Sequence, residues 1–332
     1  MGVFALKNQT TSTYNTAFGY AAGWELTTGE KNVFVGSTIA ANIAYVSASR
    51  NVCIGYEAGY TISTCTDNVF VGYYAGKANT TGYLNTFVGK DAGESCTTGN
   101  ENTFIGNRAG EAVTTATANN LLGNTTGRSI TTGYGNNFFG GECGVAITTG
   151  QRNVGMGNMV LIGVTTGDYN VGIGSGAGGS SSPSGNITTG DGNFVLGDNN
   201  INNLYCADTS ISSSDSRDKT DVTSFNIGLA WIEALRPVTY RWDRRTWYGT
   251  DEQPYGTPDG SKKRSKLHIG FLAQEALAVE QANGYGADND NSLAVHLNED
   301  GMSYGMKYER LVPILVNAIK ELSTRVQALE AG

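Results

Sequence analysis

The first two thirds of the chain repeat one short pattern of polar and apolar positions. An Asn is followed three residues later by an apolar residue and four residues later by Gly, and this unit recurs eleven times. Eight of the ten spacings are 17 residues, and the other two, 19 and 23, fit loop insertions. The repeated residues are Asn15, Asn32, Asn51, Asn68, Asn85, Asn102, Asn119, Asn136, Asn153, Asn170 and Asn193. Such a regular, glycine-rich period predicts a stacked β-coil and excludes helical repeats.

The strand expected in each unit is apolar on both faces. Position Asn+3 is apolar in all eleven units, and position Asn+2, on the opposite face of a strand, is apolar in most of them and often Phe. Such a strand needs cover on both faces. A coil only 17 residues around has no second layer for its outer face. We therefore expect neighbouring copies to cover it, most simply in a homotrimer. A β-roll in each chain and an interwoven triple β-helix both remain open.

Other repeated positions predict how the corners are built. The recurring Asn suggests an amide ladder that bonds to the backbone of the adjacent unit. The Gly at Asn+4 and the Gly of Thr-Thr-Gly suggest positive φ angles. Gly155 and Gly172 replace the Asn+2 apolar residue in two units, where we expect the interior to narrow or repack.

From Thr220 onward the periodicity changes to that of mixed helices and strands. Residues 227–235 read as a helix that must stop before Pro237. The pattern further predicts strands at 238–242, 267–271, 293–297 and 302–308, and a helix at 273–277. Apolar residues then follow a 4-3 spacing that predicts a short coiled coil over 308–330. Its seam is Tyr308, Val312, Leu315, Ile319, Leu322, Val326 and Leu329.

Composition divides the chain near Ser214. Residues 1–213 carry 8 basic and 13 acidic side chains, whereas the 119 residues that follow carry 14 and 17. We expect a mostly β protein with an α+β domain at its end. The predicted parts are an N-terminal attachment segment (1–14), a β-repeat shaft (15–200), a linker (201–213) and a C-terminal domain (214–332).

Several classes of protein are disfavoured. A net charge of −8, spread over both parts, argues against nucleic acid as a partner. No apolar run approaches a membrane span, and the first residues do not resemble a signal peptide, so we expect no membrane insertion and assembly in a cytoplasm. The five cysteines lack C-x-x-C spacing, and the Asp-Asn loop at 288–291 lacks calcium-loop spacing. We predict no metal and no cofactor.

The junction between the two parts carries candidate chemistry. Ser214 and Lys219 are five residues apart and suit a serine nucleophile with a lysine base, provided that burial makes the lysine neutral. Ser216-x-x-Lys219 also matches the signature of penicillin-binding enzymes, but the companion Ser-Asp-Asn and Lys-Thr-Gly motifs are missing. The alternative interpretation is a solvated linker, which such clusters usually form.

The repeat unit resembles the head repeats of trimeric adhesins and the shaft repeats of bacteriophage tail fibres. The resemblance covers residues 15–200, with departures at 36–50, at 178–186 and in the units that begin at Asn119 and Asn153. It implies stacked parallel β-coils in a trimer.

The C-terminal part resembles the self-cleaving intramolecular chaperone domain of endosialidase type. Four motifs in order carry this resemblance: 214–219, 232–240, 269–274 and 311–329. It implies a trimeric domain that aligns three chains and then cuts itself off. Ser214 would attack the carbonyl of Ser213, Lys219 would act as base, and Asp215 and Arg217 would support the turn. Asp218 departs from the family, which usually has an apolar residue there, and an acid beside the base could slow the reaction.

These resemblances imply a bacteriophage tail fibre or receptor-binding protein, located in the virion and assembled in the host cytoplasm. Expected partners are a host cell-surface glycan or protein receptor and, through the N-terminus, other tail or baseplate proteins. The candidate receptor contacts are Tyr20, Tyr45, Tyr56, Tyr60, Tyr73, Tyr74 and the loop 178–186. The alternatives are a polysaccharide-degrading tailspike, disfavoured because no Asp/Glu pair stands out in the shaft, and a bacterial trimeric adhesin.

Overall fold

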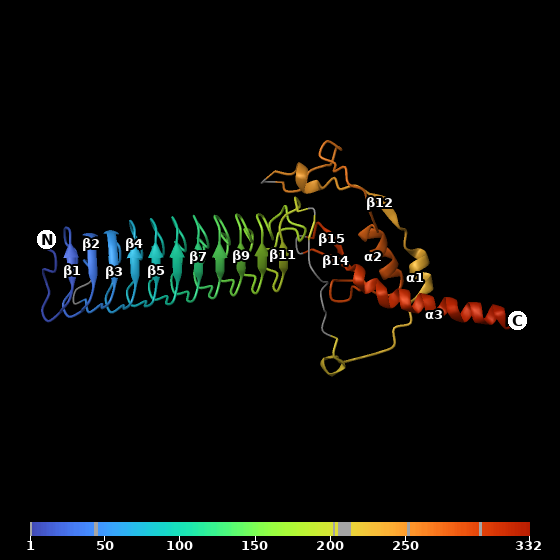
Figure 1. Ribbon diagram of the computed structural model, residues 1–332, viewed down its shortest axis with the longest axis horizontal. Helices are drawn as coiled ribbons and strands as arrows, with labels where there is room; N and C mark the ends of the chain where they lie inside the picture. The colour runs from blue at the N-terminus through green and yellow to red at the C-terminus, as the bar shows by residue number, and fades with distance from the viewer. Residues whose placement is uncertain (1, 43–45, 202, 205–213, 251–252, 299–300) are drawn as a thin grey trace. The chain divides into compact units, whose positions relative to one another are not determined.

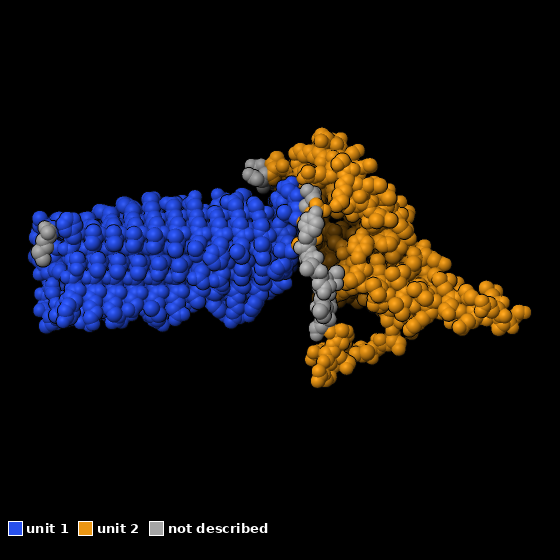
Figure 2. All heavy atoms as spheres, viewed as in Figure 1, with its two compact units in different colours: residues 1–201 blue, residues 202–332 orange. Residues whose placement is uncertain are grey.

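The computed structural model describes residues 2–42, 46–201, 203–204, 214–250, 253–298 and 301–332. The chain forms two compact units, Met1–Ile201 and Asn202–Gly332, which Figure 2 distinguishes by colour. Each unit has its own apolar core.

The first unit is a β-solenoid whose eleven short strands pair in parallel, each with its neighbours in the sequence (Figure 1). This confirms the predicted mostly β fold with 17-residue units. Each turn, called a rung here, stacks on the next rung of the same chain, as in a β-roll and unlike an interwoven triple helix. The strands are β1 (Thr16–Phe18), β2 (Val33–Ser37), β3 (Val52–Tyr56), β4 (Val69–Val71), β5 (Thr86–Val88), β6 (Thr103–Ile105), β7 (Asn120–Leu122), β8 (Asn137–Phe139), β9 (Val154–Met156), β10 (Val171–Ile173) and β11 (Phe194–Leu196).

The Asn+2 side chains fill the interior of the solenoid. Phe70, Phe87 and Phe104 are fully buried, and their rings stack with centroids 5.2 and 4.7 Å apart. The Asn+3 side chains point outward, and Phe18 and Met156 among them are 64% and 49% exposed. The coil therefore hides one strand face by itself and leaves the other uncovered within a single chain, as the sequence predicts.

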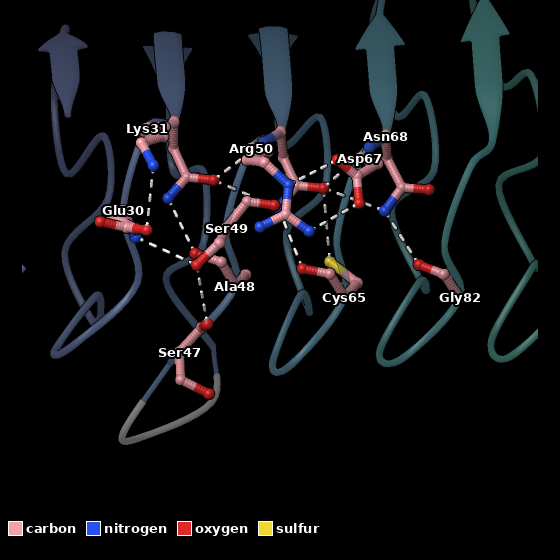
Figure 3. Close-up of polar contacts among 12 residues, drawn as sticks. Glu30, Lys31, Ser47, Ala48, Ser49, Arg50, Cys65, Asp67, Asn68 and Gly82 are labelled. Carbon is pink, nitrogen blue, oxygen red and sulfur yellow. Dashed lines mark hydrogen bonds and ion pairs between the residues drawn. The ribbon is translucent and has the colours of Figure 1, made fainter. Parts of the chain in front are cut away.

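The recurring Asn residues form a continuous amide ladder, which confirms the predicted role. Asn51 Oδ1 accepts hydrogen bonds from the backbone N and from Nδ2 of Asn68, at 3.1 and 3.0 Å. Asn68 Nδ2 also donates to the carbonyl of Gly82 at 2.9 Å (Figure 3). The pattern recurs between successive rungs, so buried corner amides are satisfied along the stack.

The two kinds of repeated glycine both lie close to the next rung, but they differ in backbone conformation. Gly89, at Asn+4, has φ +138°, as predicted. The prediction was wrong for the Gly of Thr-Thr-Gly, because Gly99 does not have a positive φ. A Cβ atom at Gly99 would instead run into the carbonyl oxygen of Ala116 in the next rung. Close stacking of rungs, and not backbone strain, excludes a side chain there.

The interior repacks where the Asn+2 residue becomes Gly, as predicted. Val160 and Leu161 are fully buried and occupy the positions where most other rungs have Ala and Gly. A Cβ atom at Gly172 would lie 2.5 Å from Val160 Cγ1. Larger residues on one wall thus fill the space that the opposite wall vacates, which keeps the interior closely packed.

Residues before Asn15 continue the coil. Leu6 N donates to Ala22 O at 3.0 Å, and Thr10 N donates to Thr27 O at 2.9 Å. Thr10-Thr11 thereby lies against Thr27-Thr28, the same place in the following rung. The described part of segment 1–14 is ordered against the first full rung, and its role in attachment stays a proposal.

The second unit is a small α+β structure that ends in a helix, which confirms the predicted class. Among its described residues, two antiparallel strand pairs, β12 with β13 and β14 with β15, accompany three α-helices. The elements are η1 (Ser216–Asp218), α1 (Leu229–Ala234), β12 (Val238–Tyr240), η2 (Arg245–Tyr248), β13 (His268–Gly270), α2 (Ala273–Ala282), β14 (Val295–Leu297), β15 (Tyr304–Met306), η3 (Tyr308–Arg310) and α3 (Leu311–Glu330).

Helix α3 has two apolar faces. Leu311, Ile314 and Ala318 are buried, and α3 packs against α1. The predicted heptad seam lies outside this contact: Ile319 is 64% and Leu329 82% exposed. One face of the helix thus belongs to the core of the unit, and the seam residues from Val312 to Leu329 are exposed.

Candidate functional site

The segment from Ser214 to Lys219 forms one tight turn. Asp215 caps the short helix η1, and its Oδ1 accepts a hydrogen bond from the backbone N of Arg217 at 2.9 Å. The backbone N of Lys219 donates to Ser216 O at 3.4 Å and closes the turn. A capped turn of this length brings the ends of the segment together.

Asp215 and Arg217 reinforce this turn through their side chains. Arg217 Nε and one terminal nitrogen bond to the two carboxylate oxygens of Asp215, the closest at 2.6 Å. The hydrogen bonds from Arg217 lower the pKa of Asp215, and Asp215 in return raises the pKa of Arg217. Both side chains are solvent-exposed, so the pair stabilises the turn only weakly. The role of Asp215 and Arg217 in supporting a cleavage site stays a prediction.

The turn places the predicted nucleophile and base in direct contact. Lys219 Nζ lies 2.7 Å from Ser214 Oγ, and both residues are exposed. A charged ammonium donates to the hydroxyl in this geometry, whereas a neutral amine at the same distance could accept the hydroxyl proton. Because the amine of Lys219 contacts the hydroxyl of Ser214, Ser214 is favoured over Ser216 as the nucleophile. Ser213, the other side of the predicted bond, lies outside the described residues.

Sequence reasoning missed a buried carboxylate elsewhere in the second unit. Glu280 on α2 is fully buried, and its oxygens accept hydrogen bonds from the backbone N of Ala294 and Val295 at 2.7 and 2.9 Å. The backbone N of Leu293 and the hydroxyl of Ser292 add two more, at 3.1 and 2.9 Å. These bonds fasten α2 to the start of β14. The helical pattern does not distinguish Glu280 from a surface glutamate.

The described cysteines and histidines offer no second reactive centre. Burial raises the pKa of the Cys65 thiol to about 12 and that of Cys96 to about 11, so neither supplies a thiolate near neutral pH. His268 lies in β13 and stacks on Tyr240, as expected for a strand residue. Within the described residues no group of three or more His, Cys, Asp or Glu is placed to hold a metal ion.

Three of the candidate receptor tyrosines, Tyr56, Tyr73 and Tyr74, contact one another. Tyr56 stacks on Tyr73 with centroids 5.4 Å apart, and Lys77 Nζ lies 3.6 Å from the centroid of Tyr74. A tyrosine that stacks on the flat face of a sugar needs a free ring face. These contacts occupy ring faces of Tyr56, Tyr73 and Tyr74. Tyr45 lies outside the described residues.

The architecture is a parallel β-solenoid joined to a compact α+β unit. A serine and a lysine are in contact at the start of the second unit. Residues 214–285, roughly a fifth of the chain, match the protein family described as chaperone of endosialidase. The match lies in the second unit and supports the predicted resemblance to an endosialidase-type tail fibre. Comparisons with curated proteins and with solved structures found no match. None of the described helices has the length and apolar character needed to span a membrane.

Proposed function

We propose that this chain is a homotrimeric bacteriophage tail fibre whose C-terminal chaperone aligns three chains and then cuts itself off between Ser213 and Ser214. The observation that carries the proposal is the contact of 2.7 Å between Lys219 Nζ and Ser214 Oγ, at the residue where the family match begins. The fibre would be part of the virion and would bind a glycan or protein on the host cell surface.

The chemistry follows from the two side chains. The amine of Lys219 takes the hydroxyl proton of Ser214, whose Oγ attacks the carbonyl carbon of Ser213. The peptide C–N bond breaks as the nitrogen of Ser214 takes the proton from Lys219 and leaves as an amine, and an ester joins Ser213 to Ser214 Oγ. Water then hydrolyses the ester to give a carboxylate at Ser213 and a free hydroxyl at Ser214. The reaction occurs once per chain and needs no cofactor.

The exposure of Ser214 and Lys219 in the single chain provides a reason for cleavage to follow assembly. In the single chain both Ser214 and Lys219 face water. Neighbouring copies packed over the turn would withdraw water and favour the neutral amine. Cleavage would then follow trimer formation and would not compete with it.

A separate chaperone solves a physical problem of the shaft. Contacts between parallel solenoids are not local in the sequence, so chain entropy is lost before packing compensates for it. Rungs that look alike also permit contacts in the wrong register. A trimer formed first by another domain sets the register, and removing that domain afterwards leaves the fibre kinetically trapped.

Denaturing electrophoresis with intact mass measurement tests the proposal. The wild type should yield fragments of residues 1–213 and 214–332, whereas Ser214→Ala and Lys219→Ala should remain intact. Ser216→Ala is the matched control and should still cut, because the amine contacts Ser214. An uncut wild type in a mature oligomer, or cleavage that persists in Ser214→Ala, would contradict the mechanism. Binding to host cells without release of sugar would support the adhesive role.

A further inference from the structure

The outward face of the eleven-stranded sheet carries no charge. It consists of positions Asn+1 and Asn+3 of every rung, and its 22 residues are 17 apolar side chains, three Thr and two Asn. Several of the apolar side chains are well exposed, including Phe139 and Ile105 at 41% and 40%. An exposed apolar stripe that runs the whole length of the solenoid is typical of an interaction surface.

Charged side chains lie on both sides of this face. Arg50 and Asp67, one residue before the repeated Asn, form an ion pair at 2.6 Å. Beyond the other end of the strands, Glu57 and Lys77 form a second pair at 2.9 Å. An uncharged strip with a charged border is the usual anatomy of an interface core and rim.

The occupant that fits this face is another copy of the same chain. The eleven strands repeat at the parallel spacing of about 4.8 Å, so the face is about 48 Å long. A partner can match it along that length only if it has the same axial repeat. Three-residue strands make the face about 10 Å wide, hence about 480 Å² in flat area, below the ~800 Å² per partner of a typical stable interface. The shaft face therefore needs chains that are already held together, and the exposed seam of α3 is a second apolar surface suited to that.

Two adjacent rungs break the apolar pattern of the face with amides. Asn120 Nδ2 donates to Asn137 Oδ1 at 2.7 Å, and Asn137 Nδ2 donates to Gly135 O at 3.1 Å. One N–H of each amide and the Oδ1 of Asn120 are left over from these bonds. When the outward faces of two copies pack together in register, the remaining amide groups of Asn120 and Asn137 meet the same groups of the neighbouring copy.

We infer that Asn120 and Asn137 set the register of the chains in the fibre, an inference that rests on the proposed homotrimer. A shift by one rung places one Asn137 opposite Val154 of the neighbour and leaves the second N–H of its amide buried without a partner. Such a group costs enough to disfavour the shifted state about tenfold or more. A single polar residue in an apolar seam selects the register of coiled coils in the same way.

Disulfide trapping in the full chain tests this inference. One chain carries Ile54→Cys and the other carries Val71→Cys, each with its own tag and with Cys206→Ser. The two chains are co-expressed and oxidised. Bonds between equal positions report correct register, and mixed 54–71 bonds report a shift of one rung, because a disulfide needs Cβ atoms about 3.5–4.5 Å apart. The wild-type face should give at least about tenfold fewer mixed bonds than matched ones, and Asn120→Val/Asn137→Val should give comparable amounts of both.

Two further variants keep the outcomes separate. Thr103→Val removes a polar group from the same face and should leave the register correct. Ile105→Lys should weaken the contact between shafts, and an equally stable oligomer in that variant would show that the face is not the interface. If wild type forms no oligomer, the proposed function fails. If the oligomer forms and Asn120→Val/Asn137→Val keeps the wild-type ratio, only the register inference is overturned.

Discussion

Two fully buried asparagines in neighbouring rungs show how much depends on hydrogen-bond partners. Asn85 donates to Gly99 O at 2.8 Å, and its Oδ1 accepts two bonds from Asn102. Asn79 is equally buried, yet both of its side-chain polar atoms lack a hydrogen-bond partner among the described residues. Most other uninterrupted rungs place Val or Ile at the position of Asn79, as at Val113.

Replacing these two asparagines should therefore have opposite effects. Asn79→Val should stabilise the solenoid by about 1–2 kcal/mol, because it removes a buried amide without partners. Asn85→Val should destabilise it by about 2–4 kcal/mol, because it leaves the backbone N of Asn102 and the carbonyl of Gly99 unpaired. Thermal and denaturant unfolding of the two variants beside wild type measures both changes. A loss of stability in Asn79→Val would mean that its amide has a partner in solution.

At this scale the sequence is informative where a residue recurs. The repeated Asn predicts the ladder because its place in the unit is constant. Asn79 occurs once at its position, and nothing in the sequence says whether its amide finds a partner. The contact between Ser214 and Lys219 is predictable from spacing only if the turn between them is known, and the Asp215 cap supplies that turn.

Side chains of adjacent rungs compensate for one another's volume in the interior. Where strand β10 has Gly172, the neighbouring wall has Val160 and Leu161 in place of Ala and Gly. The packing density of the interior is kept although the individual residues differ.

A double-mutant cycle tests this compensation. Val160→Ala should cost about 2 kcal/mol, since it removes buried methyl groups and no aromatic ring is present to fill the space. Gly172→Ala alone should also destabilise, because its Cβ would lie 2.5 Å from Val160 Cγ1. The double variant should be more stable than the sum of the two changes predicts. Additive unfolding free energies would show that the two positions are not packed against each other.

Elements of the second unit illustrate what pattern alone can predict. Helix α3 and strands β12 and β13 match their expected places because apolar periodicity marks them. Helix α2 extends to Ala282, past the predicted end at 277, and the sequence does not reveal that Glu280 fastens it to β14. Pairings across long loops depend on tertiary packing and leave no local signal.

For the whole molecule, the proposed assembly depends on two self-complementary surfaces, the outward sheet face and the seam of α3. Ile319→Lys should reduce both oligomer formation and cleavage strongly, since three like charges would meet in the seam. Val316→Lys is the matched control, because Val316 is exposed but lies outside the seam. Light scattering and electrophoresis measure the two readouts. Full cleavage by a monomeric Ile319→Lys chain would contradict the dependence of cleavage on assembly.

The constant period of the amide ladder bears on how long such a fibre can be. Excising residues 103–119 would join Asn102 directly to Asn120, so each remaining rung would keep its neighbours' contacts while the solenoid lost one step of about 4.8 Å. The length of the solenoid can therefore change in steps of one rung. Duplication or loss of 17-residue segments can change the length of the solenoid without changing the residues at either end.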